Sequence, residues 1–365
     1  MKKKRITWWW IWLCTLGAIF AAFFSLHKKT ALMNRVWWGA VFPLERKLAA
    51  LTACVSLSIA EVAIISVGVA AFFGLTYALR RRKPGRFAAV FLCGVGTIYA
   101  AFCLLWGTAY YADGFQEQSG LRARGGTVEE LYAATVRFAD GVRETAGQVP
   151  RDQNGVFAAS RQDILVGAEK AYLQAEKEFP CLHRDFIRPK AFVSSRALSA
   201  LDFTGFYFPL TGEANVNIDS PAVYLPATVC HEMAHQRGYA SEQECNFLGI
   251  LAAVSCGDPT YAYSGYLMGY VYLSNALYTR DQAAWQKVRD MLPPEALQDL
   301  RYHSAYWDQF TSPVKTVSNT VYDGFLKANG DHLGIQSYGT VVDLLLAYEG
   351  ESFSGNPCQT EKGLL

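Results

Sequence analysis

The chain reads VCHEMAHQRGYASEQECN from Val229 to Asn246, and this stretch predicts two helices joined by a tight turn. His231 and His235 are four positions apart, so on a helix both rings lie on the same face. The apolar and small residues around them are typical of a helix packed inside a core. Gly238 ends this helix, because glycine can adopt a positive φ, and a new helix begins near Ser241. The chain is therefore expected to turn back three residues after the second histidine.

This spacing is typical of a metal site. His231 and His235 can both direct a ring nitrogen at one ion, and zinc is the metal expected for a His-Glu-x-x-His helix. Glu232 would lie close enough to a metal-bound water to take its proton. A catalytic zinc needs a third protein ligand, for which Glu242 is the first candidate and Glu244 the alternative. The other interpretation of the pentapeptide is a chance match on a packed helix.

The second helix carries Glu242 and Asn246 four positions apart, and so resembles the Glu-x-x-x-Asp segment of the gluzincins. The resemblance implies that Glu242 binds zinc and that Asn246 orients His231. Two features differ from that family: asparagine replaces aspartate, and only six residues separate His235 from Glu242. Glu244 therefore stays open as the third ligand.

Three further side chains are candidates for binding a substrate or an oxyanion, namely Tyr239, Asn215 and His303, with packing or turn chemistry as the alternative for each. In zincins the strand before the metal helix pairs with an extended peptide. Residues 212–216 or 222–225 are the candidates for that strand here, and an ordinary core strand is the other interpretation.

The first third of the chain is strongly apolar and predicts three transmembrane helices, at about residues 6–25, 58–79 and 87–111. Tryptophans in the first stretch, and the two spans that follow, favour an uncleaved helix over a signal peptide. Dense basic clusters lie at residues 2–5 and 80–86, and the positive-inside rule places both in the cytoplasm. We expect a multi-pass protein of the cell membrane, with its N-terminus in the cytoplasm and its C-terminal domain outside.

The remaining chain has ordinary polarity and predicts an α+β domain at residues 119–365, after a membrane region at residues 1–118. Residues 190–224 are rich in β-branched and aromatic residues broken by glycine and proline, which predicts a small sheet. The rest of this domain is expected to be mainly helical.

Local signals indicate where several of these helices begin. Thr127 and Glu130 have the form of a capping box, and Ser160 opens a second helix. From Pro226 onward the pattern is helical to the C-terminus.

Three segments have a more specific pattern. They are YFPLTGEANVN at residues 207–217, the block at residues 221–247 that contains HEMAHQRGY, and YDGFLKANG at residues 322–330, followed by SYG at residues 337–339. Together they resemble the DUF3810 family of bacterial membrane proteins, and the resemblance covers most of the chain. It implies a membrane-tethered, zincin-like domain, and it supports the fold and the site more than the substrate.

The His-Glu-x-x-His motif and the acidic residues of the next helix predict a membrane-anchored, zinc-dependent hydrolase in which Glu232 activates a zinc-bound water. A metallopeptidase is the first candidate. A peptide or protein is the expected substrate. One alternative is a non-catalytic zinc-binding sensor or scaffold of the cell envelope, marked by a closed site with Glu244 or Cys245 as a fourth ligand. A second is a cell-wall amidase with an open, polar cleft. The net charge of +2 is too small to indicate a nucleic-acid partner.

Overall fold

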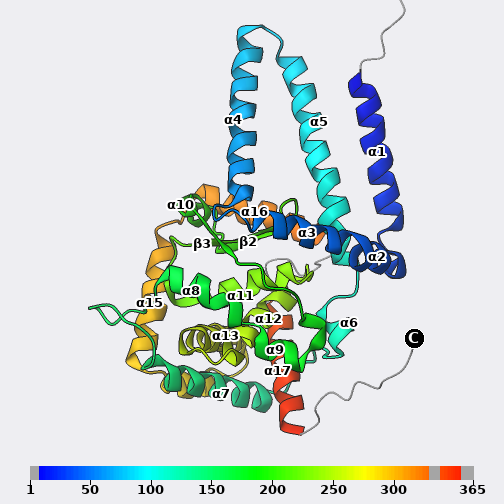
Figure 1. The fold of residues 1–365 in the computed structure, drawn as a ribbon. Coiled ribbons are helices and arrows are strands. Elements are labelled where there is room, and N and C mark those ends of the chain that lie inside the picture. The colour runs from blue at the N-terminus through cyan, green and yellow to red at the C-terminus, as the bar shows by residue number, and fades with distance from the viewer. Residues whose placement is uncertain (1–7, 329–337, 355–365) are drawn as a thin grey trace, which may run out of the picture.

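The computed structural model describes residues 8–328 and 338–354, and these residues form mostly helices with one small sheet, which confirms the α+β class (Figure 1). Several sequence expectations fall outside this part of the chain. They concern the basic cluster at residues 2–5, the start of the first apolar span at residues 6 and 7, most of the segment between residues 329 and 339 that resembles the family, and the C-terminal end of the helical pattern at residues 355–365.

Three apolar helices project from the same end of the molecule (Figure 1): α1 (Trp8–Leu26), α4 (Ile59–Arg80) and α5 (Pro84–Phe102). Within the described residues only two stretches, Ile59–Arg80 and Pro84–Gly107, are long and apolar enough to cross a membrane, so the expected count of three is corrected to two. The apolar part of α1 among the described residues, Trp10–Leu26, is shorter than these two. Phe72 and Phe73 on α4 are each 63% exposed, which is unfavourable in water. By length and composition, these helices suggest association with a membrane.

The segment between α1 and α4 packs on the C-terminal domain instead of forming a simple loop. It contains α2 (Thr30–Val36), a π-helical turn (Trp37–Val41) and α3 (Phe42–Thr52). Its side chains share a buried aromatic cluster with the end of the third apolar stretch and with the turn after α11; the members are Trp37, Phe42, Trp106, Ala109 and Ala240. The indole N–H of Trp37 also donates to the carbonyl of Gly238 at 3.1 Å. These contacts cross the boundary expected at residue 119.

The C-terminal domain contains short and long helices. They are α6 (Phe115–Ser119), α7 (Val128–Ala146), α8 (Arg161–Gly167), α9 (Leu173–Glu178), α10 (Ser195–Ala200), α11 (Leu225–Gln236), α12 (Glu242–Ser255), α13 (Pro259–Arg280), α14 (Gln282–Arg289), α15 (Pro294–Asp308), α16 (Pro313–Ala328) and α17 (Tyr338–Ser354). One of them, α10, lies within the range expected to form only a sheet. The capping box at Thr127 and Glu130 is present and begins α7. The helix expected after Ser160 is broken, because α8 ends at Gly167 and the chain passes through a 3-10 turn before α9. Helix α11 is buried along nearly its whole length, between α12, α13 and the sheet.

The small sheet is present within the expected range and has three strands: β1 (Lys190–Phe192), β2 (Gly205–Phe208) and β3 (Glu213–Asn217). The order is β1-β3-β2, with β1 parallel and β2 antiparallel to the central strand. Gly212 turns the β2–β3 hairpin with φ +68°, and a Cβ there would lie 2.6 Å from that of Ala49 in α3. In the described sheet β2 pairs with β3 alone, so it is an edge strand. Helix α3 lies against the β2–β3 hairpin.

Two carboxylates fix the base of α4 to this sheet. Glu213 of β3 accepts the backbone N–H groups of Ile59 and Ala60 at 3.1 and 2.7 Å, and it pairs with Lys190 at 2.5 Å. Glu61 in the first turn of α4 accepts two backbone N–H groups just after β1, each at 2.7 Å. An acidic group at a helix N-terminus is stabilising, so these contacts couple the projecting helix to the sheet.

Candidate metal centre

Helix α11 carries His231 and His235, and α12 carries Glu242. These two helices are brought together by the turn that follows α11. Gly238 has φ +100°, in the left-handed region, and Ser241 caps α12 by accepting the N–H of Glu244 at 3.4 Å. Further along α12, Gly249 lies against α11, where a Cβ would come within 3.0 Å of the backbone nitrogen of His231. This close crossing places the start of α12 over the histidine face of α11.

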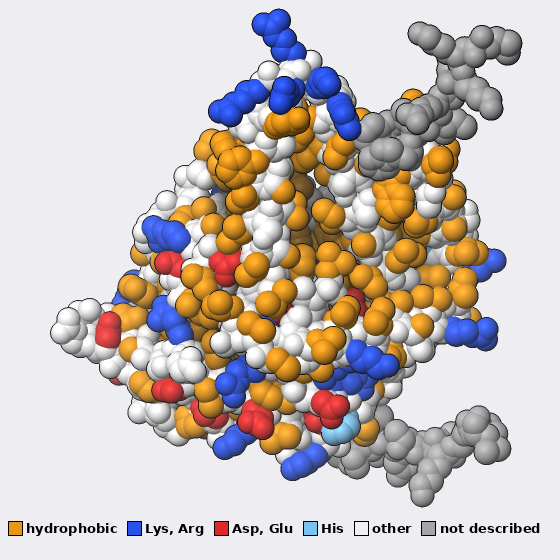
Figure 2. Space-filling view, turned by 45° about the horizontal axis from the view of Figure 1, so that its top comes forward, with side chains coloured by type: hydrophobic (Ala, Val, Ile, Leu, Met, Phe, Trp, Pro, Cys, Tyr) orange, Lys and Arg blue, Asp and Glu red, His pale blue; other side chains and the backbone are white. Residues whose placement is uncertain are grey.

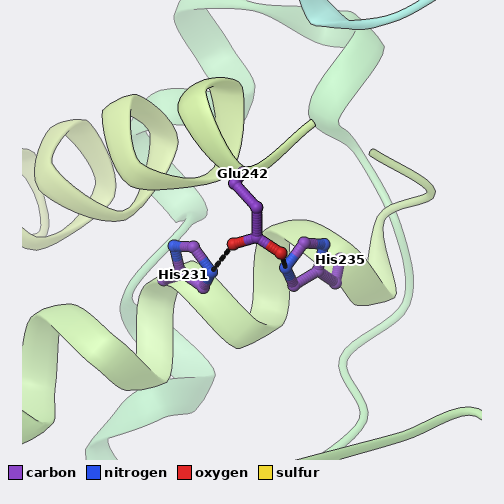
Figure 3. A group of neighbouring side chains, drawn as sticks. All are labelled: His231, His235 and Glu242. Carbon is purple, nitrogen blue, oxygen red and sulfur yellow. Dashed lines mark ion pairs between the residues drawn. The ribbon is translucent and has the colours of Figure 1, made fainter. Parts of the chain in front are cut away.

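The predicted ligands meet at that crossing. Nε2 of His231 lies 3.3 Å from one carboxylate oxygen of Glu242, and Nε2 of His235 lies 3.6 Å from the other (Figure 3). One ligand atom from each of the three residues lies within 4.8 Å of the others, so the group is able to hold one metal ion. Two imidazoles and a carboxylate are a donor set that suits zinc.

Both rings are held so that Nε2 faces the carboxylate, but only His235 has a partner on its other nitrogen. Nδ1 of His235 lies 2.8 Å from the carbonyl of Tyr239, which can only accept, so Nδ1 carries the proton and Nε2 is free for a metal. Nδ1 of His231 is buried without a hydrogen-bond partner. Asn246, which was expected to orient His231, makes no hydrogen bond to this nitrogen, although it lines the same pocket.

Glu244, the alternative ligand, is used elsewhere. Its carboxylate accepts the backbone N–H groups of Phe115 and Gln116 at 2.9 and 3.0 Å, at the start of α6. Cys245 is also turned away from the site, with its sulfur 3.3 Å from Nδ1 of His235, on the side of the ring opposite the ligand nitrogen. Among the described residues, neither joins the metal group.

The carboxylate of Glu242 has a third neighbour that local sequence patterns did not identify. The hydroxyl of Tyr322, on α16, donates to Oε1 of Glu242 at 2.8 Å. Burial, followed by the charge of Glu242, raises the pKa of Tyr322 well above its usual value, so the hydroxyl keeps its proton. No motif near residue 322 signals this role, because it depends on how α16 folds back over α12.

Glu232 lies in the same pocket and is 3% exposed, and its Oε2 has no hydrogen-bond partner. Burial raises its pKa to about 7, against the lowering effect of the two histidines. Space for the carboxylate depends on β2: a Cβ on Gly205 would lie 2.5 Å from Oε1 of Glu232. A buried carboxylate with a pKa near neutrality can both accept and return a proton.

The pKa values of His235 and Glu242 depend on the charges of their neighbours in this group. Burial alone lowers the pKa of His235, but Cys245 and Glu242 raise it overall. Burial alone raises the pKa of Glu242, but His235 and His231 hold it well below its usual range. Without a metal, the carboxylate and an imidazolium thus form an ion pair.

The three candidates for substrate contact lie in different places relative to the pocket. Tyr239 is buried and its hydroxyl donates to the carbonyl of Cys181 at 3.0 Å, so it contributes its carbonyl to His235 and not its side chain to a substrate. Asn215 is buried in the central strand and does not line the pocket. His303 does line it, accepts the indole N–H of Trp307 at 2.9 Å, and has its pKa lowered to about 4 by burial.

The pocket that contains these groups has a volume of about 670 Å³. Along one wall it is lined by the segment from Asp202 to Leu210, which includes the whole of β2, so the lining strand is neither of the two expected from sequence. Residues 222–224 form a 3-10 helix instead. The ring of Trp106, which continues the third apolar stretch, lies 5.8 Å from that of His235 and closes another side.

Comparison with known proteins identifies one family. A family model described as "Protein of unknown function (DUF3810)" matches residues 40–346, whereas no curated protein and no solved structure matches. The matched range begins before α3 and includes the sheet, both metal helices and α16. The chain belongs to the DUF3810 family.

Proposed function

We propose that this protein is a membrane-anchored, zinc-dependent hydrolase that cleaves peptide bonds. The observation that carries the proposal is the meeting of His231, His235 and Glu242 in one pocket with the unpaired, buried carboxylate of Glu232. The proposed topology places the N-terminus and the turn between the two candidate spans, α4 and α5, in the cytoplasm, and the C-terminal domain outside it. It is supported by the basic clusters at residues 2–5 and 80–86 and by the common direction of the three apolar helices.

The residues present fit a zinc ion. His231, His235 and Glu242 would hold it, and the ion would act as a Lewis acid that lowers the pKa of a water molecule. Glu232 takes a proton from the attacking water and returns it to the leaving amine, for which its pKa near 7 is suited. The hydroxyl of Tyr322 keeps the Glu242 carboxylate in place.

A peptide is the proposed substrate because of β2. The strand pairs with β3 on one side, its residues are only partly buried, and it lines the pocket along its length. An edge strand beside the site offers backbone groups to an extended peptide, which is how many proteins bind one. The cell-wall amidase remains the alternative for the same chemistry.

The alternative of a purely structural zinc has less support. Its mark is a fourth protein ligand, and in the described residues both candidates, Glu244 and Cys245, are turned away from the group. The remaining side of the metal group faces the pocket, which is the arrangement of a catalytic site.

The test begins with the full-length chain in detergent and measures bound metal by elemental analysis. We expect about one zinc per chain, lost in His231→Ala and Glu242→Ala and kept in Glu244→Gln. Glu232→Gln should keep the zinc and lower the cleavage of a quenched-fluorescent peptide library by at least about 10²-fold. Full turnover in a zinc-loaded Glu232→Gln variant would rule out the mechanism.

A further inference from the structure

The wall of the metal pocket includes part of an apolar helix that projects from the domain. Ile98, Phe102 and Trp106 all line the pocket, and all lie within the apolar stretch Pro84–Gly107. Ile98 is nine residues from the end of that stretch, which corresponds to about 14 Å along a helix. The pocket therefore extends along a surface suited to lipid, as well as into the domain.

Helix α16 forms the rim on the same side and exposes apolar as well as polar side chains. Two of its polar side chains face the domain: Lys315 pairs with Asp202 at 3.0 Å and the amide of Asn319 donates to Asp202 at 2.9 Å, whereas Thr316, Thr320 and Lys327 are exposed. Its valines face outward, with exposures of 58%, 62% and 66% at Val314, Val317 and Val321. These three residues follow helical spacing, so they form one apolar stripe.

The stripe is continuous with the metal pocket. A second, apolar groove of about 590 Å³ lies along α16, between this helix and residues 201–203, and it is lined by all three valines. It shares Phe203, Tyr322 and Phe325 with the metal pocket, and the ring of Phe325 packs on that of Phe102 at 5.0 Å. An apolar path thus leads from the outer face of α16 to the hydroxyl that contacts Glu242.

The outer face of α16 lies where a membrane surface would be. In Figure 1, α16 and α3 lie at the base of α4 and α5, at the end of the domain from which the apolar helices project. Helix α3 also exposes apolar side chains, with Leu44 at 48% and Leu51 at 71%. Figure 2 shows hydrophobic side chains over the projecting helices and onto the adjoining face, with Lys and Arg at the tip. Helices with such a stripe are typical of a membrane interface.

The chemistry of the pocket selects among molecules that reach it from a membrane. Its described lining contains no lysine or arginine, whereas it contains the carboxyl groups of Asp202, Glu232 and Glu242. Apart from the proposed zinc, a phosphate or pyrophosphate headgroup would find no cationic side chain in this lining. Aromatic walls and the edge strand β2 suit a neutral, extended polypeptide instead.

We propose that the substrates are polypeptides anchored in the same membrane, which enter along α16 and are cleaved close to the point where the chain leaves the bilayer. The inference rests on the proposed hydrolase function and names its substrate class. Soluble peptides lack the anchor that delivers the chain to the apolar path.

The test uses the full-length protein in liposomes with a defined probe: a polypeptide with one transmembrane helix and a tail of mixed sequence on the side of the domain. The same tail without the helix is the matched soluble probe. We expect Glu232-dependent cleavage of the anchored probe within about the first ten residues after the span, at least about 10-fold faster than cleavage of the free tail. Equal cleavage of both probes, or cleavage only far from the span, would overturn the substrate class and leave the hydrolase intact.

A binding measurement separates the two proposals if no cleavage occurs. A photo-crosslinking amino acid is placed at Val317, in the apolar groove, or at Leu173 on α9, which is 55% exposed and lines neither the pocket nor the groove. The anchored probe should crosslink to Val317 and not to Leu173. Crosslinking without cleavage would reject the hydrolase and keep the entry path, whereas equal or absent crosslinking at Val317 would reject the entry path.

Discussion

At the level of single side chains, Tyr322 contacts a proposed metal ligand without being a ligand itself. Its hydroxyl donates to Oε1 of Glu242 at 2.8 Å and keeps its proton because burial raises its pKa. We expect Tyr322→Phe to weaken zinc binding about 10- to 100-fold, the usual effect of removing a group that orients a ligand. Competition with a chromophoric chelator measures this. The control is Tyr302→Phe, at an exposed position that does not line the pocket; equal affinities in both variants and the parent would show that the hydroxyl has no such role.

The ion pair between His235 and Glu242 makes metal binding depend on pH. In the metal-free protein the pKa of His235 is raised, so its contribution to stability is complete below pH 6.5, its usual value, and is lost as pH rises. The pKa of Glu242 is lowered, so its contribution is complete above pH 4.5 and is lost as pH falls. Zinc must displace the proton of His235, so its affinity should increase with pH.

We therefore expect the rise in melting temperature caused by zinc to be larger at pH 8 than at pH 6. Thermal unfolding with and without zinc at the two pH values measures it. At each pH, subtracting the melting temperature without zinc from that with zinc removes the contribution of other titrating groups such as His303. His235→Ala, which lacks the ion pair, should show no zinc effect at either pH. A zinc effect that is larger at pH 6 would contradict the assignment of His235 as a ligand that loses a proton.

At the level of secondary-structure elements, β2 sets the position of the proposed general base. A Cβ on Gly205 would lie 2.5 Å from Oε1 of Glu232 and 2.9 Å from the carbonyl of Asn215, so either the carboxylate or the strand must move. A displacement of about 1 Å at a reacting group is able to lower turnover about 10²-fold. We expect this loss in Gly205→Ala, with zinc content unchanged. Gly147→Ala, at a position with no atom within 4 Å and φ −81°, should keep full activity, and equal activity of the two variants would contradict the role of β2.

Local sequence patterns predicted the helix starts, turns and side-chain spacings that depend only on neighbouring residues. The capping box at Thr127, the glycine turn at Gly238 and the i, i+4 histidines all lie where they were expected. The choice between Glu242 and Glu244 could not be made locally, because both lie in the first turn of α12. It depends on α6, because the two backbone N–H groups that bind Glu244 lie 129 and 128 residues earlier in the chain.

The same reason explains the other differences. The expectation for Asn246 came from a family pattern, and His231 is left without that partner. The cleft strand was sought directly before the metal helix, but β3 takes the central position in the sheet and leaves β2 at the edge. Tyr322 and Trp106 reach the site from segments far from the motif, and only tertiary packing places them there. Interactions that need distant segments are invisible to periodicity and spacing.

At the level of the whole molecule, the N-terminal segment is part of the domain that carries the site. Trp37, Phe42 and Trp106 are buried together against the turn after α11, and Trp106 contacts His235. By contrast, α1 contacts α5 through the indole of Trp12, which donates to Thr97 at 2.9 Å, and it does not line the pocket. The apolar helices α1 and α5 therefore differ in what they do for the candidate metal centre.

This difference predicts opposite results for two truncations. A chain of residues 29–365 lacks α1 but keeps α2, α3 and the aromatic cluster, and it should bind about one zinc with the affinity of the full-length protein. A chain of residues 120–365 loses all three aromatic side chains from the cluster, and loss of one buried large aromatic side chain typically costs about 3–5 kcal/mol of unfolding free energy. We expect it to aggregate or to bind zinc much more weakly. Size-exclusion chromatography and metal analysis of both chains measure these outcomes. A monomeric 120–365 chain with full zinc affinity would mean that the cluster only attaches the domain to the apolar helices and does not support the site.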